Sequence, residues 1–147
     1  MDYPAIIAFF DEYNEHFREF MQFEYKKLDL IHKGEIEKLS SSLSAEQAFI
    51  MKSNMLEKRR VALTGENITF AELIENAPES FKAALTEKYK VLSETVLKIK
   101  DINDNANMIV TERLKKIRAH VGENDTYDGR GGVKKETLSH STMSTNA

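Results

Sequence analysis

A chain of 147 residues with a formal net charge of −3 is long enough for one domain with a buried core, and it lacks the basic excess that nucleic-acid binding requires. It contains no cysteine, which excludes a disulfide framework, a thiol nucleophile and a thiolate metal site. No apolar run is long enough for a membrane span, and the N-terminus lacks the pattern of a signal peptide, so we expect a cytoplasmic protein without membrane insertion.

The first predicted helix runs from about Pro4 to Lys33. Pro4 suits the first helical turn, and Gly34 supplies a left-handed residue directly after the last turn. Apolar residues recur at three- and four-residue steps, which is the spacing of one helix face. We interpret its many aromatic residues as core rather than as a ligand pocket. The stripe consists of Ile6, Phe10, Tyr13, Phe17, Phe20, Met21, Leu28 and Ile31, widened by Phe9, Phe23 and Tyr25.

A second helix is predicted from about Glu35 to Leu63, antiparallel to the first because the turn at Gly34 is tight. Serines between Ser40 and Ser44 are poor helix formers, so the sequence leaves open whether this helix is continuous. Its expected apolar face consists of Ile36, Leu39, Leu43, Ile50, Met51, Leu56 and Val61.

The segment TGENITFAELIENAP that follows predicts a loop holding a short helix. Thr69 and Glu72 have the spacing of a capping box, in which each residue satisfies a backbone N–H of the other. Phe70, Leu73 and Ile74 could then pack over one end of a helical bundle, and Pro78 ends the segment.

A long third helix is predicted from Ser80 to Gly122, about forty residues without an internal glycine or proline. Its partners are about ten residues shorter, so we expect its last turns to project past the bundle and to leave an apolar stripe exposed. An exposed stripe of this kind typically marks a protein interface. The alternative is that an offset first helix or a bent second helix covers it internally. The exposed stripe would consist of Ile109, Val110, Leu114, Ile117 and Val121.

Two further features lie in the C-terminal half of the chain: an asparagine on the long helix and a change of composition after that helix. Asn103 lies on the stripe of the long helix, where a buried asparagine would fix register and an exposed one would face water. Beyond Gly122 the composition is rich in Gly, Ser, Thr and Asn, which predicts a disordered tail with Tyr127 as its one aromatic residue. The fold prediction is therefore all-α: an antiparallel three-helix bundle domain of residues 1–122, with a short capping helix before the long third helix, and a flexible tail of residues 123–147.

Catalytic and metal-binding patterns are missing from the sequence. His16, His32, His120 and His140 do not pair at metal-ligand spacing, and a lone helical histidine is more often a surface or capping residue. No nucleophilic triad or glycine-rich phosphate loop is present. The basic cluster Lys58–Arg60 lies among glutamates and is interpreted as a solvated face. We therefore predict a binding protein that is not an enzyme and uses no cofactor or metal.

The order of several motifs resembles the FlgN-type flagellar export chaperones. FEYKKLDLIHKGEIEKL is similar to the first hairpin of that family, MLEKRRVAL to the end of its second helix, and ITFAELIENAP to the segment before its long helix. DINDNANMIV resembles the asparagine-containing stretch of the long helix, and DTYDGRGGV a tail motif in which a tyrosine precedes an acid and a glycine. The likeness covers nearly the whole chain. The serine run at 40–44 and the phenylalanine-rich first helix depart from it.

The resemblance implies a cytoplasmic chaperone that binds the amphipathic C-terminal segment of flagellar hook-associated proteins and prevents their premature assembly. It also implies delivery to the export gate, with Tyr127 matching the tyrosine that engages the cytoplasmic domain of the large gate subunit. The alternative is a helical-bundle adaptor or structural protein that self-associates through the same stripe. Which client is preferred, and whether the free protein forms a homodimer, stays open from the sequence.

Overall fold

The computed structural model describes residues 1–124 of the chain, with side chains up to residue 120. Within this range the chain forms helices and no strand, which confirms the all-α prediction. The helices are α1 (Tyr3–Lys33), α2 (Ile36–Thr64), α3 (Phe70–Glu75) and α4 (Glu79–Asn124). The chain divides into two parts, Met1–Asn103 and the residues from Asp104 onward, and α4 contributes to both. The predicted tail lies almost entirely outside the described residues, so its boundary at residue 123 stays a prediction.

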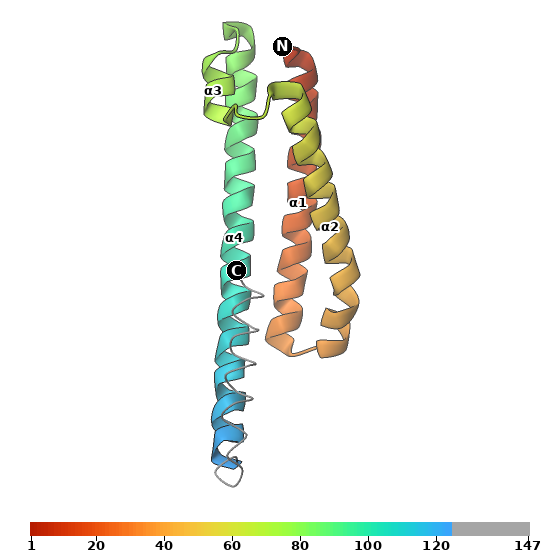
Figure 1. Ribbon diagram of the computed structural model, residues 1–147, viewed down its shortest axis with the longest axis vertical. Helices are drawn as coiled ribbons and strands as arrows, with labels where there is room; N and C mark the ends of the chain where they lie inside the picture. Colours follow the sequence, from red (N-terminus) through yellow and green to blue (C-terminus); the bar gives the residue numbers. More distant parts are fainter. Residues whose placement is uncertain (125–147) are drawn as a thin grey trace. The chain divides into compact units, whose positions relative to one another are not determined.

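Helices α1 and α2 form an antiparallel hairpin in the first part (Figure 1). The Asp2 side chain accepts a hydrogen bond from the backbone N–H of Ala5 at 3.1 Å, which caps the start of α1. At the other end Gly34 adopts φ +68°, a left-handed conformation that side chains with a Cβ disfavour. Its N–H and that of Glu35 donate to carbonyls of the last turn of α1, so the helix ends and α2 begins at once, as predicted.

The serine run does not interrupt α2, which is continuous from Ile36 to Thr64. The Ser41 hydroxyl donates to the Glu37 carbonyl at 2.9 Å, and the Ser42 hydroxyl to the Leu39 carbonyl at 2.6 Å. Both bonds return to the preceding helical turn, so these hydroxyls are satisfied without breaking the helix.

The predicted capping box at the start of α3 is confirmed. The Glu72 N–H donates to the Thr69 hydroxyl at 3.2 Å, and the Thr69 N–H donates to the Glu72 carboxylate at 2.9 Å. Gly65, at φ +102°, turns the chain out of α2 toward this short helix. The Tyr3 hydroxyl donates to the Asn76 carbonyl at 3.3 Å, which ties the segment after α3 to the start of α1.

The core of the first part is built around the N-terminal half of α1. Helix α4 joins α1 through its first turns: the Asn14 amide donates to the Lys88 carbonyl at 3.1 Å, and the Lys88 ammonium pairs with Asp11. The aromatic residues Phe9, Phe10 and Tyr13 are buried, which confirms their interpretation as core. All helices of this part contribute buried residues to one cluster: Ile6, Phe9, Phe10, Tyr13, Leu56, Leu73, Leu85 and Leu92, with Ala77 from the α3–α4 link.

The apolar face predicted for α2 is largely wrong. Ile36, Leu43, Ile50 and Met51 are exposed, whereas Leu56 is buried. The face that meets α1 is shifted around the helix and includes Phe49, whose ring lies 5.2 Å from that of Phe20, together with Ser53. In the contact between α1 and α2, the polar residue Ser53 therefore lies where the pattern predicted an apolar side chain.

Candidate binding surface

The predicted interface stripe lies on α4 in the second part of the chain. Val110 and Ile117 are 38% and 58% exposed, and Ile109 and Leu114 are half-buried. Lys115 pairs with Glu112 at 3.6 Å on the charged side of the helix. Val121 belongs to the same helix, but its side chain lies outside the described ones, as does all of Tyr127. Val110, Leu114 and Ile117 follow the three- and four-residue spacing of one helix face, so they can present apolar surface together.

A second apolar surface, missed by the sequence reasoning, lies in the first part. It is an open groove of about 400 Å³ that we call the α3–α4 groove. The ring of Phe70 in α3 lies 5.5 Å from that of Tyr89 in α4, and Val96 and Leu97 are 43% and 61% exposed. This part of α4 therefore leaves apolar side chains exposed although it also contributes Leu85 and Leu92 to the core. The groove is lined by Phe70, Tyr89, Leu92, Ser93, Val96 and Leu97.

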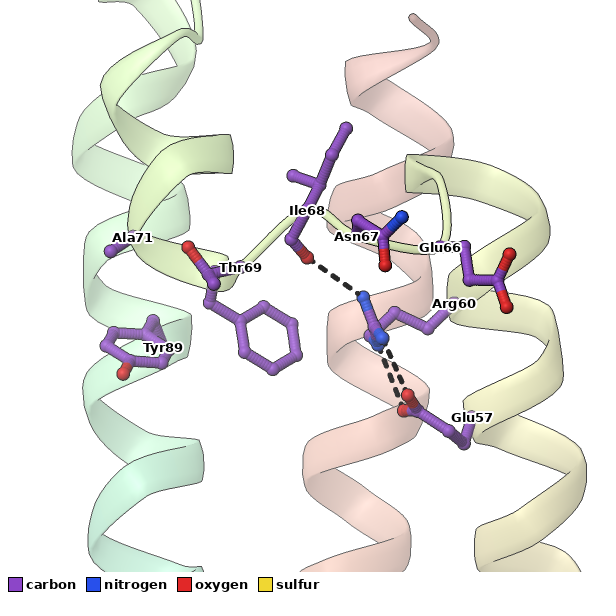
Figure 2. Close-up of a pocket in the computed structure, with 9 residues that line it drawn as sticks. Glu57, Arg60, Glu66, Asn67, Ile68, Thr69, Ala71 and Tyr89 are labelled. Carbon is purple, nitrogen blue, oxygen red and sulfur yellow. Dashed lines mark hydrogen bonds and ion pairs between the residues drawn. The ribbon is translucent and has the colours of Figure 1, made fainter.

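A polar pocket adjoins this groove and shares Phe70 and Tyr89 with it (Figure 2). Arg60 donates from Nε and Nη2 to the two carboxylate oxygens of Glu57, at 2.9 and 2.6 Å, and from Nη1 to the Ile68 carbonyl at 3.3 Å. Its guanidinium carbon also lies 5.5 Å from the centre of the Phe70 ring. The hydrogen bonds from Arg60 lower the pKa of the Glu57 carboxyl.

The interpretation of the basic cluster as a solvated face is therefore wrong for Arg60. This side chain fastens the α2–α3 link to α2, and its donors are engaged within the protein. The neighbouring Arg59 pairs with Glu12 of α1 at 2.9 Å. Because the guanidinium is already paired, the pocket offers oxygen acceptors rather than a cation to a visiting group.

The stripe on α4 and the α3–α4 groove are both apolar and lie on helices, which suits recognition of another helix. The model of one protein family, FlgN protein, matches residues 1–134. The chain belongs to the FlgN family. No curated protein and no solved structure matches the chain. The resemblance seen in the order of the sequence motifs is thus confirmed, and with it the assignment to a family of flagellar export chaperones. None of the described helices combines the length and the apolar character needed to cross a membrane.

The FlgN-family hairpin contains a buried histidine, whereas the sequence favoured a surface or capping role for each histidine. His16 is 1% exposed, and its Nε2 lies 2.7 Å from the Ser53 hydroxyl. Because that hydroxyl donates to the Phe49 carbonyl at 2.9 Å, it accepts from the His16 ring. The other ring nitrogen, Nδ1, is buried with no hydrogen-bond partner among the described residues. Burial and the nearby Lys52 lower the pKa of His16, so the ring is held neutral.

A second buried polar group lies two turns further along α1. Glu24 is 2% exposed, and Lys27 contacts both its carboxylate, at 3.5 Å, and that of Glu46 in α2. Burial, followed by the interaction with Glu46, raises the pKa of Glu24 to about 7. These polar contacts cross the α1–α2 seam and fix which turns of the two helices face each other. Among the described side chains, no group of three His, Asp or Glu residues could hold a metal ion.

Proposed function

We propose that this FlgN-family chain is a cytoplasmic export chaperone that holds the amphipathic C-terminal segment of a hook-associated protein against α4. By covering that segment it would prevent premature assembly, and it would then deliver the client to the flagellar type III export gate. The observation that carries the proposal is the exposure of Val110 and Ile117 on a helix of a chaperone-family protein. The client-binding residues would be Ile109, Val110, Leu114, Ile117 and Val121.

The physical basis is the burial of two apolar helix faces against each other. A client segment that becomes helical only in the assembled filament junction exposes apolar side chains while it is a monomer. Each Å² of apolar surface covered contributes about 25 cal/mol before the cost of association is subtracted, so side chains such as Ile117 and Leu114 supply part of the driving force for capture. The stripe needs no catalytic group, which agrees with a chaperone that releases its client unchanged.

The remaining parts of the chain take supporting roles in this proposal. Residues 1–122 form the helical domain, an antiparallel three-helix bundle in which α3 caps one end. Residues 123–147 act as a flexible tail that carries Tyr127, the docking residue for the cytoplasmic domain of the large gate subunit. In the absence of client, the same domain forms a homodimer.

Co-expression with the C-terminal segment of a hook-associated protein tests client binding directly. We expect a stable 1:1 complex, and Val110→Asp or Ile117→Asp should abolish it because a buried carboxylate lacks a partner. Ala119→Asp is the matched control, since Ala119 is exposed on the opposite side of the same turns and should leave binding unchanged. Helix content by circular dichroism should be the same for all three variants. Absence of binding at tens of micromolar would refute the proposal.

Gate docking is tested separately with Tyr127→Ala. This variant should bind the client as tightly as the unmodified chain and should pull down less of the gate domain. Unfolding of the helical domain in this variant would contradict the assignment of Tyr127 to a tail.

A further inference from the structure

We infer that two copies of the chain pair through one face of α2, with the two α2 helices antiparallel and centred on Gln47. The inference deepens the proposed function and rests on it, because it assigns a surface to the homodimer proposed there. It specifies the face, the orientation and the register of the pair, and each of the three can be tested.

The face in question, which we call the α2 outer face, turns away from α1 (Figure 1). At 3.6 residues per turn, Gln47 points about 120° from Ser53, which contacts α1, and about 180° from the buried Leu56. Leu43 is 54% exposed and Met51 is 66% exposed. An exposed apolar row of this length typically marks an interface. The α2 outer face consists of the exposed residues Ile36, Ser40, Leu43, Ser44, Gln47, Ile50, Met51, Asn54 and Met55.

The α2 outer face carries no charge, although 31% of the residues of the chain are charged. Between residues 39 and 55 the only charged residues are Glu46 and Lys52. Glu46 pairs with Lys27 of α1, and Lys52 lies near the buried His16, so neither belongs to the face. Opposed like charges destabilise an interface. Two copies can meet over these turns without such a contact.

Charged residues at the two ends of the face set the orientation of the pair. Glu37 lies just before the uncharged stretch and Lys58 just after it, and neither has an ion-pair partner among the described residues. A parallel pair would place Glu37 beside Glu37 and Lys58 beside Lys58. An antiparallel pair places Glu37 of each copy near Lys58 of the other, and the two-fold axis repeats this contact at both ends. Charge complementarity therefore favours the antiparallel pair.

The same match fixes the register. Gln47 lies ten residues after Glu37 and eleven residues before Lys58, so the two-fold axis passes close to Gln47. Leu43 then lies opposite Met51 of the second copy, which brings apolar side chains together. The two copies of Gln47 meet at the axis, where a side-chain amide can both donate and accept a hydrogen bond.

The other glutamates near this contact are held on the α1 side of α2. Glu57 is level with Glu37 of the second copy, but its carboxylate accepts from the Tyr13 hydroxyl at 3.3 Å and pairs with Arg60 at 2.6 Å. Glu46, next to the axis, is held toward α1 by its ion pair. These carboxylates are thus already paired within each chain and do not oppose the register.

The α2 outer face covers about five turns of a single helix, which makes a small interface. Small interfaces are typical of weak and reversible contacts, so we expect pairing to depend on the protein concentration. The face shares no residue with the proposed client site on α4, so the two can be changed separately.

Cysteine cross-linking tests the face, because the chain has no cysteine of its own. Gln47→Cys in the full chain should form a covalent dimer under mild oxidation. Ala45→Cys is the matched control, because Ala45 is exposed two residues away on the other side of the same helix. It should remain monomeric on a denaturing gel, although a maleimide should label both thiols. Failure of Gln47→Cys to cross-link above the Ala45→Cys background would overturn the inference.

A mixture of two single-cysteine chains tests the register. Leu43→Cys alone should not cross-link, since its two copies would lie about 12 Å apart along the helices, beyond the reach of a disulfide. The same holds for Met51→Cys alone. The two variants together should form a mixed dimer, identified by its mass. A Leu43→Cys homodimer that forms as readily as the mixed dimer would contradict the antiparallel register.

Charge reversal tests the orientation. Glu37→Lys and Lys58→Glu should each raise the dimer dissociation constant by about tenfold, because each change acts at two symmetric contacts. The double variant should recover the original constant, as measured by sedimentation over a range of concentrations. A double variant that pairs as weakly as the single variants would rule out the Glu37–Lys58 contact.

Light scattering and client binding separate this inference from the proposed function. Leu43→Asp should be monomeric and should still bind the client segment at 1:1, whereas Ala45→Asp should remain dimeric; both should keep their helix content. A Leu43→Asp chain that stays dimeric would overturn the inference and leave the client site untouched. Loss of client binding in Leu43→Asp alone would assign the α2 outer face to the client instead of a second copy. An unmodified chain that cross-links through Gln47→Cys but never binds client would refute the proposed chaperone function and not the pairing.

Discussion

Glu24 provides the sharpest test of how the α1–α2 seam is held, through the substitution Glu24→Gln. The pKa of this carboxyl is about 7 in the folded chain against an ordinary value of 4.5, because the group is buried and faces Glu46. Between these two values the unfolded chain has already lost the proton that the folded chain retains. Stability is therefore lost as the pH rises through this window, by at most about 3 kcal/mol. Glutamine has the same shape and no proton to lose, so the variant should escape this loss.

Urea denaturation followed by circular dichroism measures the effect at pH 5 and pH 8. At pH 8 Glu24→Gln should be more stable than the unmodified chain, by less than the full figure because Lys27 partly compensates the buried carboxylate. At pH 5 the two proteins should unfold at nearly the same urea concentration. His16 acts with the opposite sign, since its lowered pKa costs stability as the pH falls, but it is present in both proteins and cancels. Glu94→Gln, at an exposed position, is the control and should show no pH-dependent difference. A Glu24→Gln variant that is less stable at pH 8, or whose effect does not change with pH, would refute the reasoning.

Two further predictions concern packing and capping in the first part of the chain. Leu85→Ala should lower the free energy of unfolding by about 2–5 kcal/mol, because the side chain is fully buried. Leu97→Ala, at 61% exposure, should change it by less than about 0.5 kcal/mol. Chemical denaturation of both variants measures the difference. Thr69→Ala removes one half of the capping box and should lower the free energy of unfolding by about 1 kcal/mol. Thr86→Ala, at an exposed position inside α4, serves as the control. Equal effects of the two substitutions would contradict the capping role of Thr69.

The helices and their ends could be predicted because local chemistry decides them. Gly34 marked the end of α1, and Thr69 with Glu72 marked the start of α3. These signals act within one or two turns, so neighbouring residues contain the information. The turn at Gly34 and the start of the short helix after Thr69 could therefore be placed from the sequence.

The buried face of α2 could not be predicted because it depends on a partner helix. The apolar pattern favoured Ile36, Leu43 and Ile50, yet the seam with α1 uses Ser53, which bonds to His16. Burying a histidine is tolerated only when its polar atoms find partners or its charge is suppressed, and neither condition is visible from one helix alone. The same holds for Arg60, whose acceptors come from the α2–α3 link as well as from α2.

The two apolar surfaces differ in the same way, because one could be predicted from the sequence and the other could not. The stripe that includes Val110 and Ile117 was predicted from the spacing of its apolar residues and from the length of the helix, and both side chains are exposed. The α3–α4 groove could not, because it forms only when Phe70 of a separate helix comes to lie beside Tyr89. Only the off-stripe position of Leu97 pointed to additional apolar surface in that half of the helix.

The alternation of buried and exposed apolar residues along α4 connects stability with function. Leu85 and Leu92 are buried, whereas Tyr89 and Val96, each four residues further on, are exposed. Leu85 and Leu92 fasten the helix to the core. Tyr89 and Val96 leave apolar surface uncovered, and covering it would contribute roughly 25 cal/mol per Å². A helix anchored by one line of side chains presents the neighbouring line in a fixed geometry, so a partner does not bear the cost of ordering it. The contacts that bury Leu85 and Leu92 therefore hold Tyr89 and Val96 in place at the surface of the helix.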